Sequence, residues 1–580
     1  MAQYKTPGVY VVEQNAFPNS VVEVATAVPA FIGYTQFADN KGTPLAGTPW
    51  RISSMAEFIM YFGGPPPTTY SLDTIATAKA TDTSADKSAD KPEDKAADKP
   101  AADGAADAPK RPVVTDLFIG AVGARKPFKF TPQTKEYLLY YSMLFFFQNG
   151  GGPCYIVSVG TYADGDIDSG KLTAGIDALV KEQEPTMVLV PDAVRLSRQD
   201  CATVQTHMLQ HCGYTMRNRF AILDVFDGMW DRQAPGGDAI TNFRDDVGTS
   251  FLDFGAAYYP WVNTSIVTEK DLDFTKISNL AQLQALITTE LAAVINPPET
   301  ASPADKAKAK QVKDVVAKLT GGAPAAKTDG AATPAADGDA DAAKPADAGG
   351  DAKPAAPMSK DDIATLHKTL SVISTVYVQV LQALQKKVNL MPPAAGMAGL
   401  YTLVDNTRGV WKAPANISLN GVVSPCVNIS NADQEDLNVP TSGKSVNAIR
   451  SFIGEGVLVW GARTLDGNSL DWRYLSVRRT MIMIEESLRL ACKAYVFEPN
   501  TANTWVTIKS MVRNFLTSVW KRGGLAGASP DDAFQVFVGL GETMTGDDIL
   551  EGLLKVTVLV AVSRPAEFIE LTFQQQMQKS

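Results

Sequence analysis

Cysteine and histidine are scarce in this sequence. Its 580 residues include five cysteines and three histidines. The cysteines are odd in number, widely separated and without any CxxC spacing, so no disulfide framework is expected. A reducing compartment therefore fits the chain best. The five positions are Cys154, Cys201, Cys212, Cys426 and Cys492.

The histidines offer little for metal binding or for catalysis. His207 and His211 lie four residues apart, a spacing that can hold zinc on a helix. The residues between them, Met-Leu-Gln, lack the glutamate of a zinc protease, and the remaining His367 is far away in the sequence. We interpret the pair as structural and expect no metal site. No GxSxG motif is present, so a Ser-His-Asp triad is not expected either.

Long hydrophobic runs are also missing. The most apolar stretch, 137–147, is too short to span a bilayer and ends in Gln-Asn-Gly-Gly-Gly. The N-terminus, MAQYKTPGVYVVEQ, has no apolar core behind a basic start, so it does not resemble a secretory signal. The sequence therefore predicts a soluble cytoplasmic protein that does not insert into a membrane.

Positive charge is in deficit, and nucleotide-binding motifs are missing. The formal net charge of −10 argues against a general nucleic-acid binder, which would carry a basic stripe. No GxGxxG or GxxxxGK[ST] motif follows a predicted strand, so we expect no cofactor. Asp192 and Asp227 follow predicted strands, where α/β proteins bind ligands. We interpret both carboxylates as loop caps rather than as an acid/base pair.

Two tracts have almost no apolar side chain larger than alanine. Residues 76–112 and 301–357 consist mainly of Ala, Asp, Lys, Thr, Ser, Pro and Gly. Such segments cannot bury enough surface to offset their ordering entropy, so we predict disorder in both. The exception is 305–319, which reads as a marginal helix. We interpret both tracts as solubilising surface loops.

Between these tracts, apolar strands alternate with helices. This alternation is typical of βαβ units and predicts a mostly parallel sheet. Pro260 would place the last strand at a sheet edge. The expected strands are 154–159, 186–190, 220–226 and 257–262, with a further short strand at 31–34. The expected helices are 135–147, 172–181, 199–216, 239–253, 280–295 and 361–390, with another beginning at Ser54.

The last third of the chain, 444–573, carries the clearest pattern. Apolar residues recur at steps of three and four over 473–495 and again over 504–521, which predicts two amphipathic helices. The period then changes to that of strands, at 535–539, 553–562 and 568–573. This pattern by itself indicates a compact α+β domain.

Five sequence blocks in this region carry a family resemblance. They occur in the order found in the C-terminal domain of contractile tail sheath proteins of phages and of phage-tail-like bacterial injection systems. The region resembles that domain over nearly its whole length, and shorter matches extend the resemblance to residue 6. The blocks are 456–465 (GVLVWGARTL), 471–479 (DWRYLSVRR), 496–500 (VFEPN), 541–545 (GETMT) and 564–569 (RPAEFI). The shorter matches are 6–10 (TPGVY), 146–151 (FFQNGG) and 405–416 (DNTRGVWKAPAN).

The resemblance implies a multidomain α/β plus α+β fold. It places a mostly parallel α/β domain outside and an α+β C-terminal domain inside, with N- and C-terminal β-arms that add strands to neighbouring subunits. The implied divisions are 1–24 (arm), 25–75 (start of the outer region), 76–112 (tract), 113–300 (outer domain), 301–357 (tract), 358–443 (return segment), 444–562 (inner domain) and 563–580 (arm). The expected arm residues are Pro7, Gly8, Val9, Tyr10, Val11, Phe568, Ile569, Leu571 and Phe573.

The function implied by the resemblance is structural, not enzymatic. Such a subunit would polymerise with copies of itself in stacked hexameric rings around an inner tube protein, between a baseplate and a cap protein. It would contract to drive the tube forward, either as a virion tail or as a particle in the bacterial cytoplasm. The alternatives are an α/β enzyme with an unrecognised strand-end site and another self-assembling shell protein. Charged residues beside the apolar stripe are expected to contact the tube or adjacent subunits, namely Arg473, Arg478, Arg479, Glu485 and Glu486.

Overall fold

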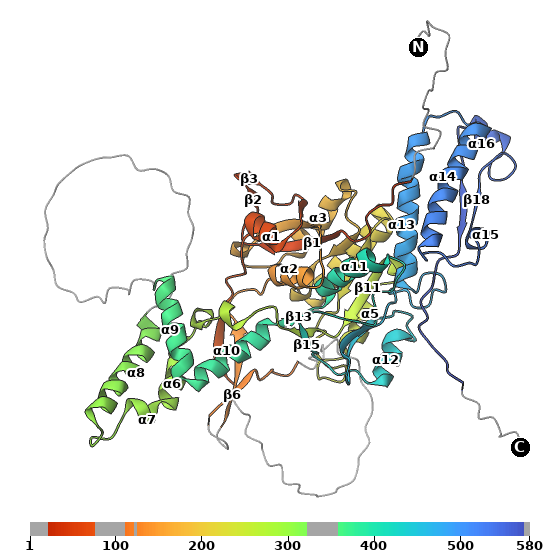
Figure 1. Ribbon diagram of the computed structural model, residues 1–580. Coiled ribbons are helices and arrows are strands. Elements are labelled where there is room, and N and C mark those ends of the chain that lie inside the picture. The colour runs from red at the N-terminus through yellow and green to blue at the C-terminus, as the bar shows by residue number, and fades with distance from the viewer. Residues whose placement is uncertain (1–20, 76–110, 121–124, 322–357, 573–580) are drawn as a thin grey trace, which may run out of the picture. The chain divides into compact units, whose positions relative to one another are not determined.

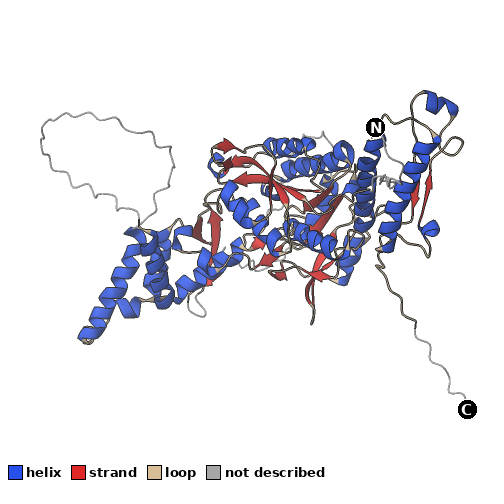
Figure 2. Ribbon diagram, turned by 45° about the horizontal axis from the view of Figure 1, so that its top comes forward, coloured by secondary structure: helices blue, strands red, loops and turns tan. Residues whose placement is uncertain are grey.

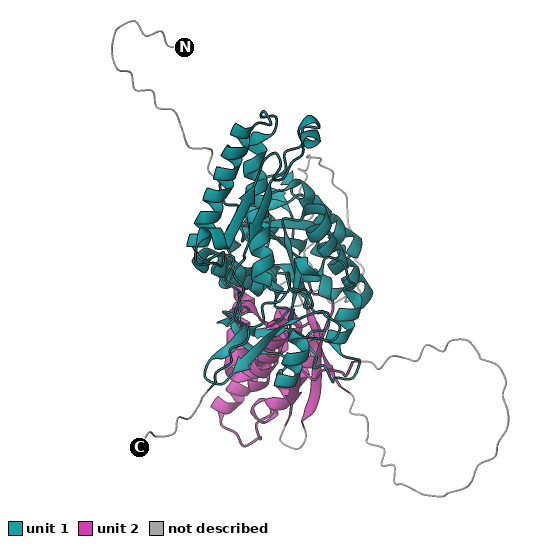
Figure 3. Cartoon of the chain, turned by 90° about the vertical axis from the view of Figure 1, so that its right-hand side faces the viewer, with its two compact units in different colours: residues 1–66, 137–266, 391–580 teal, residues 67–136, 267–390 magenta. Residues whose placement is uncertain are grey.

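The computed structural model describes residues 21–75, 111–120, 125–321 and 358–572 (Figure 1). The chain forms two compact units, coloured separately in Figure 3. Unit 1 comprises Met1–Pro66, Tyr137–Ile266 and Met391–Ser580, and unit 2 comprises Pro67–Glu136 and Val267–Leu390. Unit 2 is therefore made of two excursions from the chain of unit 1. This division differs from the expected one, in which 113–300 formed one domain.

Unit 1 is built on a nine-stranded mixed sheet, whose strands are drawn in red in Figure 2. The six strands from β16 to β8 run parallel to one another, which confirms the mostly parallel α/β prediction. The outer strands β14, β17 and β4 are antiparallel to their partners. The spatial order is β14 (Ile417–Ser418), β17 (Gly456–Trp460), β16 (Asn447–Phe452), β11 (Gly255–Tyr259), β10 (Phe220–Asp224), β9 (Met187–Leu189), β1 (Pro29–Thr35), β8 (Cys154–Thr161) and β4 (Trp50–Ile52).

The strands form where the sequence is continuously apolar, as expected for a sheet covered on both faces. Every residue of β1 is buried, and Phe31 pairs with Ile156 of β8 on one side and Leu189 of β9 on the other. The expectation of an edge position for the strand before Pro260 is wrong. β11 lies between β10 and β16 and ends at Tyr259, so Pro260 stands outside the strand and removes no ladder hydrogen bond.

Helices cover both faces of the sheet. Neighbouring residues of a strand point to opposite faces, and here a Cβ added at Gly33 would meet Leu139 of α2, while Ile32 contacts Gly175 of α3. Around α2 lie α1 and α11, while α4 packs on α3 and α5 packs on α4. These helices are α1 (Met55–Phe62), α2 (Leu139–Gln148), α3 (Ser169–Ala178), α4 (Arg198–Gln210), α5 (Ala239–Asp246) and α11 (Ala394–Arg408).

Local sequence explains how several of these helices begin and pack. α1 begins after Ser54, whose hydroxyl accepts the Glu57 N–H at 3.3 Å, as the sequence predicted. α11 packs against α2 through small residues, because a Cβ at Gly396 would lie 2.4 Å from the Phe145 ring. Shorter elements of unit 1 are β2 (Asp39–Asn40), β3 (Thr43–Pro44), β12 (Val262–Thr264), β15 (Val422–Pro425), α12 (Asn431–Asn438) and the single turns 162–164, 179–181, 191–195, 211–216 and 252–254.

The C-terminal part of unit 1, from α13 onward, is an α+β subdomain. α13 (Leu475–Cys492) and α14 (Ala502–Lys521) lie side by side in Figure 1, with β18 (Phe534–Phe537) beside α14. β18 pairs with β19 (Thr557–Val560), which is much shorter than the strand expected over 553–562. Two short helices, α15 (Pro530–Ala533) and α16 (Gly546–Leu550), and a turn at 493–495 complete it.

Unit 2 has its own sheet and core. Its three-stranded antiparallel sheet has the order β5 (Tyr70–Thr74), β7 (Lys126–Pro132) and β6 (Leu117–Ile119). Phe128, Phe274, Leu283, Tyr377 and Leu384 lie in one buried cluster. Its helices are α6 (Leu280–Glu290), α7 (Ala292–Ile295), α8 (Pro303–Gly321), α9 (Lys360–Ile373) and α10 (Thr375–Val388), with turns at 269–271 and 274–276, and β13 (Leu390–Met391) spans the return to unit 1. The marginal helix expected over 305–319 is α8, and the rest of both predicted tracts lies largely outside the described residues.

Candidate assembly interface

α13 and α14 form the core of the C-terminal subdomain. The predicted stripe of α14 is confirmed, because Ile508, Val512, Phe515 and Val519 are all buried there. They pack against Ile484 of α13 and against the inner face of the β18–β19 hairpin. This packing gives a rigid support for whatever the outer side of the hairpin contacts.

The β18–β19 sheet is small and has open edges. Among the described residues, each of these strands pairs only with the other, Phe534 with Val560 and Phe537 with Thr557. Val558 and Val560 are half-buried against the helices, while Leu559 is 54% exposed. A two-stranded ribbon is marginal by itself and leaves backbone N–H and C=O groups free to pair with another strand.

The predicted C-terminal arm is exposed but does not form a strand within the described residues. Phe568, Ile569 and Leu571 are 73%, 79% and 73% exposed, and no strand is assigned over 568–572. The described residues therefore supply no strand partner for 568–572. Phe573 lies outside the described residues, as do the N-terminal arm residues Pro7, Gly8, Val9, Tyr10 and Val11.

Arg478 lies inside the chain rather than on an outer face of α13. Its side chain is 5% exposed, and its guanidinium carbon lies 3.8 Å from the centre of the Phe254 ring and 4.6 Å from that of Trp472. Nε is 3.5 Å from Asp253 Oδ2. Burial lowers the pKa of Arg478 and raises that of Asp253, because both charged groups have lost water.

Arg479 makes a second buried contact, with different partners. Its guanidinium donates to both carboxylate oxygens of Asp405 in α11, at 2.9 and 2.6 Å, and to the Thr26 carbonyl at 2.9 Å. It also lies 4.7 Å from the centre of the Tyr401 ring. Both arginines therefore join α13 to the α/β part of unit 1. Both side chains are therefore buried within the chain and are not exposed for the predicted contact with the tube or an adjacent subunit, because the first half of α13 is covered on more than one face.

The other charged residues predicted for this helix are divided between surface and interior. Glu485 is exposed. Its carboxylate has nevertheless lost part of its water, and this partial burial raises its pKa. Glu486 is buried, and hydrogen bonds from Arg489 at 2.6 and 2.7 Å hold its pKa below the ordinary value. Arg473 is half-buried, 5.5 Å from the centre of the Tyr474 ring. Of the five, Glu485 is the residue that lies in the exposed class.

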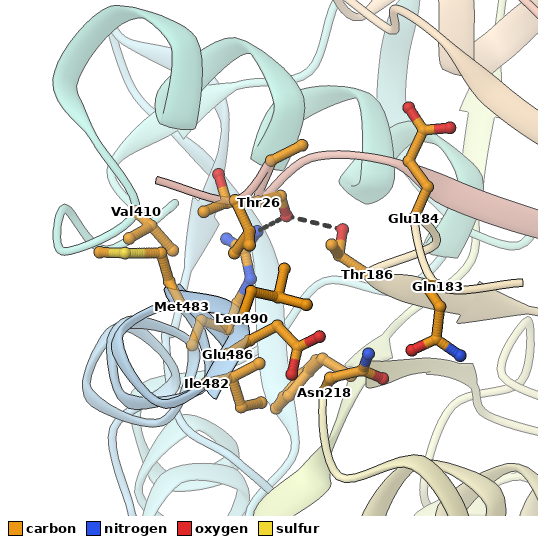
Figure 4. A pocket seen from close by; sticks show the side chains of 14 residues that line it. Thr26, Gln183, Glu184, Thr186, Asn218, Val410, Ile482, Met483, Glu486 and Leu490 are labelled. Atoms are coloured by element: carbon orange, nitrogen blue, oxygen red, sulfur yellow. Dashed lines mark hydrogen bonds between the residues drawn. The ribbon is translucent and has the colours of Figure 1, made fainter. Parts of the chain in front are cut away.

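A cavity of about 300 Å³ lies beside α13, where the segment 24–26 crosses it (Figure 4). Its wall is mainly apolar and includes Val410, Ile482, Met483 and Leu490. The dashed lines in Figure 4 mark two hydrogen bonds accepted by the Thr26 carbonyl, from Arg479 and from Thr186 Oγ1 at 2.8 Å. The Val24 N–H also donates to Ser487 Oγ at 3.1 Å. These contacts hold the N-terminal segment against α13.

The carboxyl ends of the sheet strands, where an α/β enzyme would bind its ligand, hold buried helix caps. Asp192 accepts the N–H groups of Tyr34 at 3.0 Å and Leu138 at 2.6 Å, the latter at the start of α2. Asp224 accepts the Ala394 N–H at 2.8 Å, at the start of α11. Burial raises the pKa of Asp192 to about 6 and that of Asp224 to about 7. The predicted capping role of Asp192 is confirmed, while the sequence reasoning missed Asp224.

The two helical histidines have separate partners. His207 Nε2 lies 2.8 Å from Asp177 Oδ1, whereas His211 Nε2 lies 2.9 Å from a guanidinium nitrogen of the buried Arg219. Burial lowers the pKa of His211 to about 4. Within the described part of the chain, no group of three or more His, Cys, Asp or Glu side chains could hold a metal ion. The same residues contain no helix both long and apolar enough to cross a membrane.

A polar contact at the root of the C-terminal arm was missed by sequence reasoning. Glu567 forms a paired hydrogen bond with the buried Arg463, and Asn438 Nδ2 donates to the same carboxylate at 2.8 Å. The available signal was a lone charge in each of two otherwise uncharged stretches, Arg463 in 456–465 and Glu567 in 565–569. Nothing local to either stretch indicated that they would meet.

Comparison with known proteins identifies the C-terminal region. Residues 468–576 match the family described as phage tail sheath C-terminal domain. The tail sheath protein of Vibrio phage KVP40 is 24% identical over 167 residues, covering 28% of this chain and 24% of that protein. The tail sheath protein of Burkholderia phage BcepMu is 26% identical over 156 residues, covering 26% of this chain and 32% of that protein. Each match therefore spans about a third or less of the relative's length.

Solved structures extend the likeness to the whole fold. The anti-feeding prophage helical sheath in its contracted state matches with a TM-score of 0.52 at 24% identity, covering 99% of this chain and 100% of that one. The sheath complex of the PVC extracellular contractile injection system, also contracted, matches with a TM-score of 0.51 at 22% identity, covering 99% of both chains. Residues 468–576 thus match a phage tail sheath C-terminal domain, and the fold of the chain is similar to that of the contractile sheath structures.

Proposed function

We propose that the chain is the subunit of a contractile sheath that polymerises around an inner tube and contracts to drive the tube through a target envelope. The observation that carries this proposal is an open strand pair and an exposed apolar segment in the same C-terminal sheath domain. β18 and β19 have backbone edges that are not paired with another strand of the described chain. Phe568, Ile569 and Leu571 are apolar side chains exposed to solvent, and burying them against another chain would be favourable.

These two features complement each other between copies. An extended segment that adds to a sheet edge gains main-chain hydrogen bonds and buries alternate side chains. The C-terminal arm of one copy would pair beside β18–β19 of another, and repeated pairing would give a closed ring or a helix. The N-terminal arm, including Pro7 to Val11, would act in the same way.

The similarity to contractile sheath structures supports the proposed partners. Further copies of the chain form the polymer, an inner tube protein fills its centre, and baseplate and cap proteins close its ends. An anti-feeding prophage baseplate structure contains a chain similar to this one, with a TM-score of 0.51. Glu485, exposed on α13, remains available for the tube or an adjacent copy. The assembled particle would be a virion tail or a cytoplasmic particle of a bacterium.

The proposed role is structural rather than catalytic. The strand ends at which an α/β enzyme would bind its substrate hold Asp192 and Asp224, whose carboxylates cap α2 and α11. A substrate would have to displace these helix starts to reach either carboxylate. This arrangement disfavours the enzyme alternative.

Negative-stain electron microscopy tests the proposal. The full chain, mixed with its tube protein, should give hollow striated cylinders. A variant without residues 1–23 and a variant without residues 568–580 should remain as discrete particles under the same conditions. Discrete particles from the full chain in the presence of tube protein would overturn the sheath proposal. Normal cylinders from both truncated variants would overturn the arm mechanism alone.

A further inference from the structure

Arg463 is a buried cation in a rigid setting just beyond β17. It is 3% exposed. The Asn447 side-chain amide binds the backbone of Arg463 through two hydrogen bonds. It accepts the Arg463 N–H at 2.8 Å and donates to the Arg463 carbonyl at 2.8 Å. The Arg463 guanidinium is therefore presented at a fixed place, and it requires an anionic partner.

That partner comes from the far end of the chain. Arg463 Nε donates to Glu567 Oε1 at 3.0 Å, and its terminal nitrogen donates to Oε2 at 2.6 Å. The Asn438 amide donates to Oε1 at 2.8 Å, and the Tyr474 hydroxyl lies 3.3 Å from Oε2. Arg463 also donates to the Asn438 carbonyl at 3.2 Å. The end of α12, the residue before α13 and the loop after β17 thus converge on one carboxylate.

Glu567 is held much more firmly than the residues on either side of it in the C-terminal segment. Just before it, Arg564 makes only an exposed ion pair of 3.8 Å with Asp471. Just after it, Phe568 and Ile569 are largely exposed. Burial raises the pKa of Glu567, but the hydrogen bonds from Arg463 and Asn438 outweigh it and hold the pKa below the ordinary value. Figure 1 shows the chain passing away from the helices beyond this region.

We propose that Arg463, Asn438 and Tyr474 form a clamp on Glu567 that fixes the root of the C-terminal arm, so that only the residues after Glu567 pass to a second copy of the chain. The passage of the arm to a second copy rests on the proposed function. The clamp contacts themselves lie within a single chain. Removing Glu567 from the clamp would leave Arg463 buried without an anion, so the root stays in place while the following residues engage a neighbour. Arg463 and Asn438 are thus positioning residues for assembly.

Cleavage by a glutamate-specific protease tests the clamp in the monomer. The scissile bonds after Glu567 and Glu570 lie three residues apart, so the second is an internal control for the first. In the unsubstituted chain, cleavage after Glu570 should be at least about tenfold faster than after Glu567, whose carboxylate is held. In R463K and N438A the ratio should fall toward one, while R513K, which alters the exposed Arg513–Asp531 pair, should leave it unchanged. Equal rates at both sites in the unsubstituted chain would overturn the clamp.

Assembly then tests whether the clamp positions the arm. E567Q keeps the side-chain size but loses the charge that pairs with the buried Arg463. It should reduce the pelleted polymer formed with tube protein about tenfold, while circular dichroism at the assembly temperature should show that the chain is still folded. E570Q is the matched control and should assemble normally. Normal polymer from E567Q would overturn the positioning role while leaving the sheath proposal intact. Absence of polymer from the unsubstituted chain would overturn the sheath proposal, and the protease result would still decide the clamp.

Discussion

At the scale of single residues, Arg478 and Arg479 are the main correction to the sequence reading. An amphipathic pattern predicts one buried face, and charged residues beside the stripe are then placed outside. α13 instead packs against the core of its own subdomain through Ile484 and against the α/β part of unit 1 through the two arginines. Each guanidinium meets its own carboxylate and its own aromatic ring, which offsets the loss of water.

Removing one member of the Arg479–Asp405 pair should destabilise the chain strongly. The Asp405 side chain is 1% exposed, so R479A would leave an unpaired buried carboxylate. We expect the free energy of unfolding to fall by about 3 kcal/mol, measured by urea denaturation with circular dichroism. R513A, which breaks an exposed pair, is the control and should change it by less than about 1 kcal/mol. In the R479A/D405A double variant the loss should be smaller than the sum of the single losses; additive losses would contradict a direct coupling.

Asp224 should make stability depend on pH. Its pKa is raised to about 7 by burial, so the folded chain holds this proton more tightly than the unfolded chain does. Its stabilising contribution is full below pH about 4 and is lost as the pH rises to about 7, on the order of 1 kcal/mol for each pH unit. D224N keeps an oxygen for the Ala394 N–H but cannot ionise, so its stability should fall less over this range.

The comparison has to be made between D224N and the unsubstituted chain at each pH. His211 acts in the opposite direction, because its pKa is lowered to about 4 and protonation at low pH destabilises the fold. Urea midpoints at pH 4.5, 6 and 7.5 would give the difference. A constant difference between the two proteins across this range would show that Asp224 does not titrate there.

At the scale of elements, strand pairing carries the assembly. The β18–β19 hairpin is half-covered by α14, and its other side and edges are open. The C-terminal segment that the sequence predicts as a strand lacks a strand partner among the described residues, since a strand forms only where a second backbone supplies its hydrogen bonds.

Making the arm polar should abolish assembly without affecting the fold. Phe568, Ile569 and Leu571 are at least 73% exposed, so the triple variant F568S/I569S/L571S loses little packing within the chain. We expect an unchanged melting temperature and no sedimenting polymer with tube protein present. V372S, which alters another highly exposed apolar residue, serves as the control. Full-length polymer from the triple variant would exclude these side chains from assembly.

At the scale of the whole molecule, unit 2 is a double insertion. Each excursion begins and ends at neighbouring points, since Thr68 Oγ1 donates to the Lys135 carbonyl at 3.3 Å and the Val267 N–H donates to Asn389 Oδ1 at 2.9 Å. Unit 2 also has a hydrophobic core of its own, which includes Phe128, Phe274 and Tyr377. Segments with these properties can usually be removed without unfolding the domain that carries them.

Replacing 69–134 and 268–388 by Gly-Ser linkers of about four residues each should leave unit 1 folded. The shortened chain should unfold cooperatively in a thermal melt and still form cylinders with tube protein, because the strands and arms of the C-terminal subdomain all belong to unit 1. Loss of cooperative unfolding would contradict the independence of the two units. A folded product without cylinders would instead place an assembly contact in unit 2.

Much of the fold could be predicted because its signals are local. Continuous apolar runs identified β1, β8, β9 and β10, and the three-four spacing identified α13 and α14 within a few residues of their ends. The division into domains could not be predicted in this way. Residues 447–460 were assigned to the inner domain, whereas β16 pairs with β11 and extends the large sheet of the α/β part. A strand's own sequence does not specify which edge it joins.

The sequence by itself determined the resemblance of the C-terminal region to tail sheath proteins, the α/β and α+β character and the positions of most elements, because these depend on motifs and on periodicity along the chain. The tertiary structure decided which charges are buried and which strands remain open. Arg479 with Asp405 and Arg463 with Glu567 lie 74 and 104 residues apart. Packing brings the members of each pair together, and each pair of charged side chains then forms a buried ion pair inside the chain. The same packing covers only the inner face of β18–β19 and leaves Leu559 and Phe568 exposed within the described chain.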